Sequence, residues 1–169
     1  MNASGADWKN FLKELHKFGT FEDYWAIINT IEPASRLQKG CRYYIFKNEK
    51  EKQIQPLWED EANLGGYEIF GDYPNQEEGK RGPAKSNVKS QEDWINLTIS
   101  ILGNIFKHVE YINGVEFNCR GPRNKVGIWT RKIEDETIFN EIKAELQSVL
   151  VNCSSIGHSI IELKEDNPK

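Results

Sequence analysis

Short strand-like runs alternate with three helical stretches along this chain, and this alternation restricts the fold more than any other feature. The strand-like runs are rich in aromatic and β-branched residues, and they lie at residues 42–47, 67–70, 111–119, 126–131 and 156–163. The helical stretches lie at residues 20–31, 90–107 and 135–150. No internal repeat or domain boundary interrupts them. We predict a single domain over residues 1–169 of the α+β class, with a curved, mainly antiparallel β-sheet and three helices packed on its convex face.

Local signals predict where several of these elements begin and end. Thr20-Phe-Glu-Asp23 and Ser90-Gln-Glu-Asp93 are capping boxes, and each predicts the start of a helix. Gly71-Asp72 is expected to end the second strand. Residues 72–89 are polar, rich in Gly, Pro, Asn and Lys, and without periodicity, which predicts a long mobile loop. Flexibility is also expected at the two ends, residues 1–7 and 164–169.

Composition limits the classes of function. The net charge of −4 and the pI near 5.5 argue against a protein that coats nucleic acid, because such binding usually shows as a basic excess. No apolar run approaches the roughly 18 residues that span a bilayer, and the first residues given do not show the basic-then-apolar pattern of a signal sequence. Cys41, Cys119 and Cys153 form no metal-binding spacing, so reduced thiols in a cytoplasmic or nuclear protein are expected. Neither a metal nor a cofactor is predicted.

One segment carries the strongest functional signal. Trp58-Glu59 places an indole beside a carboxylate in a stretch that is neither helix nor strand. The ring can stack on a planar base, and the carboxylate can accept its N–H groups. Trp8, Trp129 and the basic stretch at residues 120–125 add further rings and positive charge, which together suggest a site for a positively charged base that carries phosphates. The alternative for each tryptophan is a place in the core, and for the basic stretch a solvated turn.

The helices suggest a second surface. Helix 20–31 and helix 90–107 both carry apolar arcs wider than the roughly 100° stripe that covers one face of a sheet. Excess apolar surface favours a groove for a partner helix. The alternative is that all of these side chains belong to the core.

Several motifs in order make the chain similar to the eukaryotic translation initiation factor 4E family, whose members bind the 7-methylguanosine cap of mRNA. The likeness runs from Trp8 to about Gly157. The motifs that carry it are Thr20-Phe-Glu-Asp-Tyr-Trp25, Gly40-Cys-Arg-Tyr43, Pro56-Leu-Trp-Glu-Asp-Glu61, Asn63-Leu-Gly-Gly66 and Lys125-Val-Gly-Ile-Trp-Thr130.

The resemblance implies a role for each matching residue of the cap site. Trp8 and Trp58 would sandwich the base, and Glu59 would accept hydrogen bonds from its Watson–Crick edge. Trp129 would contact the N7-methyl group. The phosphates would be held by Arg120 and Lys125, in the basic loop between the third and fourth predicted strands, and more weakly by Asn118. An arginine that the family often has after the double glycine is replaced here by Tyr67.

The resemblance also implies a scaffold or repressor protein that binds the helices through a short helical motif. Trp25 matches the central anchor of this surface. The residues expected around it are Phe21, Ile95, Asn96, Ile99 and Gly103. Asn96 stands where many members have a glutamate that meets a basic side chain of the partner.

These observations predict a non-enzymatic protein that binds capped mRNA and recruits it for translation initiation through a scaffold protein. A cap-binding repressor is a close alternative. The opposing class is a metal-dependent nucleotide or cap hydrolase that uses Glu59, Asp60 and Glu61. These carboxylates are consecutive and no histidine or further acidic cluster accompanies them, so a metal site is not expected.

Overall fold

A computed structural model describes residues 11–49, 52–74 and 85–163. The chain divides into two units, residues 1–33 and 34–169, and each is described by itself. Trp8 and the two termini that were expected to be flexible lie outside the described residues. The single-domain organisation stays a prediction.

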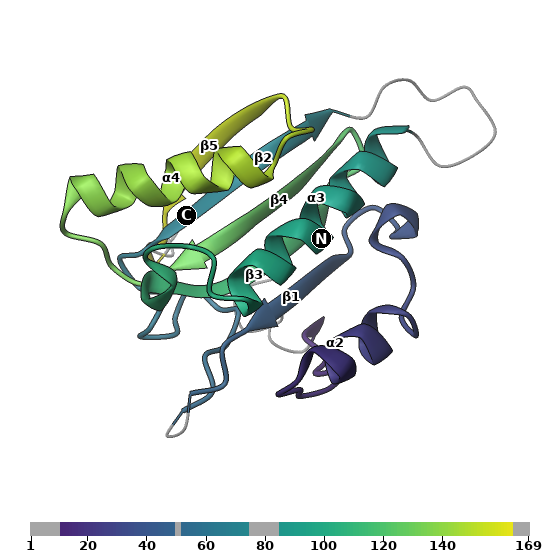
Figure 1. The fold of residues 1–169 in the computed structure, drawn as a ribbon, viewed down its shortest axis with the longest axis horizontal. Coiled ribbons are helices and arrows are strands. Elements are labelled where there is room, and N and C mark those ends of the chain that lie inside the picture. Colours follow the sequence, from purple (N-terminus) through teal and green to yellow (C-terminus); the bar gives the residue numbers. More distant parts are fainter. Residues whose placement is uncertain (1–10, 50–51, 75–84, 164–169) are drawn as a thin grey trace, which may run out of the picture. The chain divides into compact units, whose positions relative to one another are not determined.

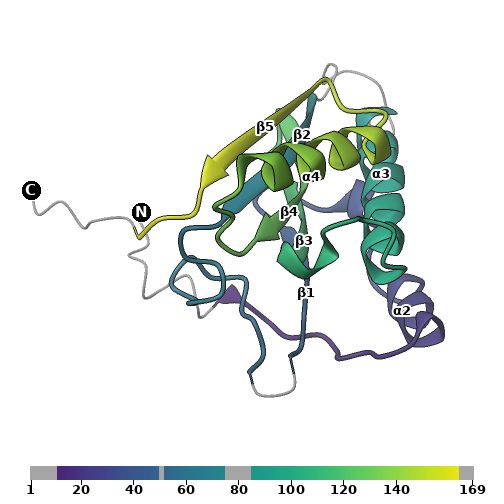
Figure 2. The same ribbon diagram turned by 60° about the vertical axis from the view of Figure 1, so that its left-hand side comes forward.

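The second unit is built on a five-stranded antiparallel sheet (Figure 1). The strands are β1 (Arg42–Phe46), β2 (Tyr67–Pro74), β3 (Ile112–Cys119), β4 (Arg123–Thr130) and β5 (Ser155–Ile160), in the spatial order β1-β3-β4-β2-β5. Two helices, α3 (Lys85–Leu102) and α4 (Glu136–Val149), lie side by side along one face of the sheet (Figure 2). The predicted α+β class with its curved antiparallel sheet is confirmed.

The core of this unit lies between the sheet and the two helices. The Trp94 ring of α3 meets the Phe117 ring of β3 at 6.0 Å between centroids, and both side chains are almost fully buried. On the same face of the sheet, the Phe139 ring of α4 packs on the Tyr67 ring of β2 at 4.6 Å between centroids. These contacts come from alternate residues of each strand, so the intervening residues point to the other face.

The first unit contains helix α2 (Phe21–Ile28). The hydroxyl oxygen of Thr20 accepts a hydrogen bond from the Asp23 backbone N–H at 3.1 Å, which confirms the predicted helix start with Thr20 as its N-cap. Tyr24 packs between Phe18 and Trp25, with ring centroids 5.8 and 5.2 Å apart.

The prediction that Gly71-Asp72 ends the second strand is wrong, because β2 continues to Pro74. A Cβ at Gly71 would lie 2.8 Å from the Cys153 Cβ and 3.0 Å from Leu150 Cδ1. This glycine therefore permits a close approach of the segment after α4 rather than a turn.

The predicted start of the second helix is also wrong. α3 begins at Lys85, so Ser90 lies inside the helix, fully buried, and not at its N-cap. Asn124 of β4 donates hydrogen bonds from Nδ2 to the Asn87 side-chain oxygen at 2.9 Å and to Ser90 Oγ at 3.1 Å. These tertiary bonds hold a polar first turn that shows no apolar periodicity in the sequence. The expected loop at residues 72–89 is therefore shorter at both ends, and its remainder, residues 75–84, lies outside the described residues.

The same helix ends five residues earlier than predicted. α3 stops at Leu102 because Gly103 and Asn104 follow, and Asn104 adopts a positive φ of 53°. β4 begins at Arg123, so Lys125 lies on a strand and not in the loop where it was expected. The third helix agrees with its prediction: Asp135 caps α4 by accepting from the Thr137 N–H at 2.8 Å. No described helix is both long and apolar enough to cross a membrane.

Candidate functional site

The candidate site lies on the face of the sheet that points away from α3 and α4, called the far face below. Three rows of side chains cross this face, because the registers of all four strand pairs are aligned. From β1 to β5 the rows are Arg42, Asn118, Lys125, Asp72 and Ser155; Tyr44, Glu116, Gly127, Phe70 and Gly157; and Phe46, Gly114, Trp129, Glu68 and Ser159.

The second and third of these rows contain both glycines and aromatic rings. A Cβ at Gly114 would lie only 2.3 Å from the Phe46 ring, and one at Gly157 would lie 3.0 Å from the Phe70 ring. Each ring therefore occupies the space next to a neighbouring glycine that a larger side chain would fill. Gly127 lies between Glu116 and Phe70 in the middle row, where it contributes no side chain. The rings and glycines together form a platform with polar side chains around it.

Trp129 is fixed within this platform. Its ring meets Phe46 and Tyr44 edge-on, at 5.6 and 6.2 Å between centroids, and only 2% of its surface is exposed. The indole Nε1 donates a hydrogen bond to Glu116 Oε2 at 2.8 Å. Trp129 is therefore buried, which was the alternative considered for it from the sequence. Its contact with an N7-methyl group stays a prediction.

Glu116 was not singled out in the sequence, yet it is the most unusual group of the far face. Burial raises the pKa of its carboxyl group, and the Glu68 charge adds to this rise. The indole hydrogen bond and the Arg42 charge act in the opposite direction. Arg42 Nη1 lies 3.5 Å from Glu116 Oε1 and donates to the Tyr44 hydroxyl at 3.0 Å. The sequence offered no signal for this cluster, because it forms only when β1, β3 and β4 pair.

The predicted phosphate-binding residues cluster at one end of the far face. Lys125 Nζ lies 3.2 Å from the centroid of the Phe70 ring. Burial lowers the pKa of the Lys125 amine, and the nearby Arg120 charge also lowers it, whereas Glu68 raises it. Asn118 pairs with Lys125 across the strands and is buried, while Arg120 is exposed at the turn that follows β3.

The segment that carries Trp58 and Glu59 is a loop with a dense network of hydrogen bonds. Asp60 Oδ2 accepts from the Gln55 N–H at 2.9 Å, and its Oδ1 accepts from the Ala62 N–H at 3.0 Å. Asn63 Nδ2 donates to the carbonyl oxygens of Gln55 and Leu57 at 2.8 and 2.9 Å. Both Asp60 and Asn63 are buried, whereas Trp58 is 40% exposed and Glu59 is exposed. The loop therefore presents its indole and carboxylate from a fixed base.

This loop is attached to the end of the sheet that carries Trp129. Asn113, at the start of β3, donates from Nδ2 to the Ala62 carbonyl oxygen at 2.7 Å and to Asn63 Oδ1 at 2.9 Å. A Cβ at Gly66 would lie 1.9 Å from the Thr130 carbonyl oxygen, so only glycine permits this approach. The roles of Asp60 and Asn63 as internal anchors of this loop were missed in the sequence.

Tyr67, which follows the double glycine, points away from the far face. It packs against Phe139 and His158 on the helix side, with ring centroids at 4.6 and 6.2 Å. Its side chain is therefore part of the contact between β2 and α4, in agreement with the absence of a phosphate-binding arginine at this position.

The predicted partner-binding residues fall in both units. In the first unit, Phe21 and Trp25 are 43% and 40% exposed. In the second unit, α3 turns Leu97 and Ile101 into the core, while Ile95 and Ile99 are half-buried and Asn96 and Gly103 are exposed. The assignment of these residues to one partner surface stays a prediction.

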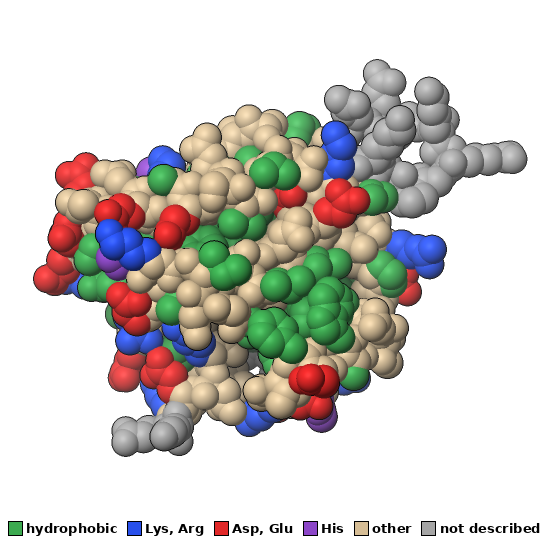
Figure 3. Space-filling view, viewed as in Figure 1, with side chains coloured by type: hydrophobic (Ala, Val, Ile, Leu, Met, Phe, Trp, Pro, Cys, Tyr) green, Lys and Arg blue, Asp and Glu red, His purple; other side chains and the backbone are tan. Residues whose placement is uncertain are grey.

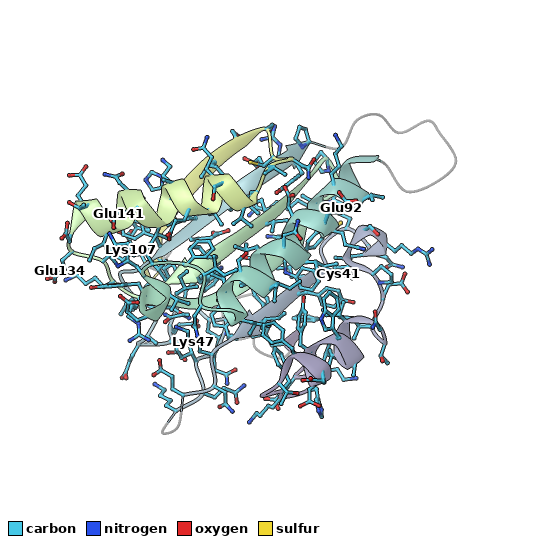
Figure 4. All side chains as sticks on the ribbon, in the orientation of Figure 1. Cys41, Lys47, Glu92, Lys107, Glu134 and Glu141 are labelled. Carbon is cyan, nitrogen blue, oxygen red and sulfur yellow. The ribbon has the colours of Figure 1, made fainter. Side chains whose placement is uncertain are left out.

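The surface around the start of α4 has a different character. Charged side chains gather there in the space-filling view (Figure 3). Glu141 and Glu134 project outward from this end (Figure 4), and they pair with Lys107 at 2.8 Å and with Lys132 at 2.9 Å. These ion pairs form a charged face that is in contact with solvent. Among the described residues, no group of three or more histidine, cysteine or acidic side chains is placed to hold a metal ion.

The fold and the tryptophan loop together define a protein with aromatic rings and glycines on one sheet face and helices on the other. Comparison with known proteins identifies the family to which this protein belongs. Residues 1–165 match the family model "Eukaryotic initiation factor 4E". The chain is 31% identical over 153 residues to eukaryotic translation initiation factor 4E1 of Drosophila melanogaster, with 88% of this chain and 52% of that protein covered. It is 32% identical over 151 residues to factor 4E of Aplysia californica, with 88% and 64% covered.

Solved structures give the same result. eIF4E-3 of Ascaris suum, in a complex with an m7G cap, matches with a TM-score of 0.79 and 30% identity, over 95% of this chain and 84% of that chain. eIF4E-3 of C. elegans, in a complex with the 4E-binding protein Mextli, matches with a TM-score of 0.79 and 28% identity, over 90% and 82%. The chain belongs to the eukaryotic initiation factor 4E family, and it spans about half to two thirds of the length of the curated relatives named above.

Proposed function

We propose that this protein binds the 7-methylguanosine cap of mRNA and recruits it for translation initiation through a scaffold protein. The observation that carries the proposal is the loop of Trp58 and Glu59. It presents an exposed indole beside an exposed carboxylate, and its buried hydrogen bonds fix it to the Trp129 end of the sheet. Family membership and the m7G cap bound by the Ascaris suum relative support this reading.

In this proposal Trp58 stacks on the methylated base, and Trp8 supplies the second ring of the sandwich. A positively charged base gains a cation–π contribution of about 0.5–1 kcal/mol at an exposed ring and about 2 kcal/mol or more when desolvated. Glu59 accepts from the guanine N1–H and exocyclic amine, which adenine cannot imitate. Trp129 contacts the methyl group.

The phosphates of the cap extend toward Lys125 and Arg120, with Asn118 beneath them. Burial lowers the pKa of the Lys125 amine. The negative charge of a phosphate at this position would act in the opposite direction and favour the charged form of the amine. Arg120 adds a forked guanidinium at the adjoining turn.

The proposed protein partner is a scaffold or repressor with a short helical motif. Trp25 and Phe21 of α2 are proposed as its anchors in the first unit, and Ile95, Asn96 and Ile99 of α3 in the second. The complex of the C. elegans relative with a 4E-binding protein supports a partner of this kind. The identity of the partner decides between recruitment and repression. A cytoplasmic location, with a nuclear fraction, is part of this proposal.

The family to which the chain belongs consists of cap-binding factors and not of enzymes, which counts against the hydrolase. The geometry of Asp60 counts against it as well. Both of its carboxylate oxygens accept backbone N–H groups inside the loop, so Asp60 does not offer a free oxygen to a metal ion.

Tryptophan fluorescence titration tests the cap site. We expect quenching by 7-methyl-GTP at concentrations well below those needed for GTP, since only the methylated base carries the positive charge. Trp58→Ala and Glu59→Ala should each weaken binding of 7-methyl-GTP by tenfold or more, in line with stacking worth roughly 1–3 kcal/mol per base. Equal affinity of the wild type for both nucleotides would contradict the proposal.

Trp25→Ala is the matched control for these variants. It should bind 7-methyl-GTP like the wild type and lose binding of a scaffold-derived helical peptide. Unchanged peptide binding in Trp25→Ala would show that this residue has only a structural role in α2.

A further inference from the structure

Glu116 is a buried carboxylate on the far face that none of the roles above uses. Only 3% of its surface is exposed. Its Oε2 accepts the hydrogen bond from Trp129 Nε1 at 2.8 Å. Its Oε1 has no hydrogen-bond partner within the described part of the chain, and Arg42 Nη1 lies 3.5 Å away.

Stability alone does not account for a charged group at this position. Replacement of a buried ion pair by apolar residues is often neutral or stabilising, and a neutral oxygen would satisfy the indole N–H equally well. Glu116 nevertheless places a carboxylate in the middle row, beside Gly127, which contributes no side chain. The backbone of β2 lies close against Gly127, so no side chain separates Glu116 from the neighbouring Phe70 ring. A buried carboxylate on this face, with one oxygen that has no hydrogen bond within the described residues and only Arg42 nearby, indicates a ligand of positive charge.

We propose that Glu116 is a positioning and specificity residue of the cap site. Its hydrogen bond holds the Trp129 indole in place, and its negative charge favours the positively charged 7-methylguanine over neutral guanine. This inference rests on the proposed function, because it requires that the base lie near Trp129.

The charge of Glu116 acts on the charge of the base and not on its shape. Shape contacts with Trp58 and Trp129 are nearly equal for the two bases, which differ by one methyl group. The Coulomb attraction exists only for the methylated base, and it is stronger inside the protein than in water because the surroundings screen it less. Glu59 reads the Watson–Crick edge that both bases share. Glu116 thus supplies a discrimination that Glu59 cannot.

The groups around Glu116 make this discrimination sensitive to pH. Arg42 and Tyr44 face it from β1, Lys125 from β4 and Glu68 from β2. The two cations favour its ionised form, whereas burial and the Glu68 charge favour its protonated form. Acidification therefore neutralises Glu116, and the preference for the methylated base declines.

Two variants separate the charge from the hydrogen bond. Glu116→Gln keeps an oxygen acceptor for Trp129 Nε1 and removes the charge, whereas Glu116→Leu removes both. Glu136→Gln is the matched control, since it makes the same charge change at an exposed position of α4. Dissociation constants for 7-methyl-GTP and for GTP are measured by calorimetry at pH 7.5 and at pH 5.5 for all four proteins, so the titration of the nucleotide itself cancels between them.

We expect Glu116→Gln to lower the ratio of the two affinities at pH 7.5 by roughly three- to tenfold, as for loss of one charge interaction at a binding site. This loss should come from 7-methyl-GTP, with GTP unchanged, and the ratio of the variant should no longer respond to pH beyond the control. Glu116→Leu should in addition alter the near-ultraviolet circular dichroism of Trp129.

Three results would overturn the inference. A wild-type ratio in Glu116→Gln at both pH values removes the role of the charge. An unaltered tryptophan spectrum and wild-type binding in Glu116→Leu remove the positioning role. A wild type that does not distinguish the two nucleotides overturns the proposed function itself, and the inference with it.

Discussion

At the scale of single residues, the second unit depends on a few buried polar groups that join distant segments. Asp93 of α3 is the clearest of these, and it is fully buried. Its Oδ2 accepts from the Tyr73 hydroxyl at 2.7 Å and from the Asn152 N–H at 2.9 Å, and its Oδ1 accepts from Asn152 Nδ2 at 2.8 Å. One carboxylate thus connects α3 to β2 and to the segment after α4. Burial and the Asp93 interaction both raise the pKa of Tyr73, so its hydroxyl stays protonated and donates.

Removal of this carboxylate should be among the most destabilising single changes in the protein. We expect Asp93→Ala to lower the free energy of unfolding by about 3 kcal/mol, because the buried Tyr73 hydroxyl and two donors of the half-buried Asn152 lose their acceptor at once. Urea denaturation measures the change. Tyr73→Phe is the comparison variant, and it should lose only about 1 kcal/mol since it removes one bond and leaves two. Equal losses in both variants would contradict the shared role of Asp93.

At the scale of elements, the loop between β1 and β2 differs from ordinary connections because its own side chains satisfy its backbone. Asn63 contributes most, with bonds to the carbonyl oxygens of Gln55 and Leu57 and a further bond from Asn113. A loop held in this way keeps its shape without a ligand, which suits a segment that presents a binding side chain.

Asn63→Ala should loosen this loop without unfolding the sheet. We expect faster amide hydrogen exchange over residues 52–66, a loss of about 1–3 kcal/mol in the free energy of unfolding, and weaker binding of 7-methyl-GTP because Trp58 is no longer fixed. Glu61→Ala is the control, since its carboxylate is exposed and pairs with Lys52 only at 3.5 Å. Unchanged exchange in Asn63→Ala would show that the loop is held by other contacts.

At the scale of the whole molecule, one buried carboxyl group on the far face makes the free energy of unfolding depend on pH. The pKa of Glu116 is raised above its ordinary value near 4.5, so the folded protein binds this proton more tightly than the unfolded chain. Its contribution to stability is therefore largest at low pH, and it declines as pH rises from about 4.5 toward the raised pKa. The exposed carboxylates Glu134 and Glu141 have lowered pKa values and contribute in the opposite sense.

The difference between the wild type and Glu116→Gln isolates this effect. We expect the variant to gain stability relative to the wild type as pH rises from 4.5 to 8, because a neutral amide has no charge to bury. Urea denaturation at several pH values measures both profiles. Parallel profiles would show that Glu116 titrates alike in the folded and unfolded protein. A gain in stability together with a loss of selectivity for the methylated base would identify Glu116 as a residue kept for binding at the expense of folding.

The sequence allowed the existence and order of the strands, the third helix and the Thr20 cap to be predicted, because aromatic and β-branched runs and capping residues are local signals, whereas the end of β2 and the start of β4 were missed. The first turns of α3 could not be predicted, since Asn124 holds them from a strand 34 residues beyond Ser90. The role of Gly71 was misread for a similar reason: a glycine that ends a strand and one that admits a neighbour look alike in sequence. The cluster around Glu116 depends on the pairing of strands that are not consecutive, so no window of the sequence contains it.

The buried hydrogen bonds of Asp60 and Asn63 have a kinetic consequence. Because the loop of Trp58 is already assembled, a cap that binds as proposed would not wait for a rare conformation of this segment, and association should proceed in a single phase at a rate set by encounter. Ligands that differ in methylation should then differ mainly in how long they stay bound. This protein would then distinguish two messages by their dissociation rates rather than by their association rates.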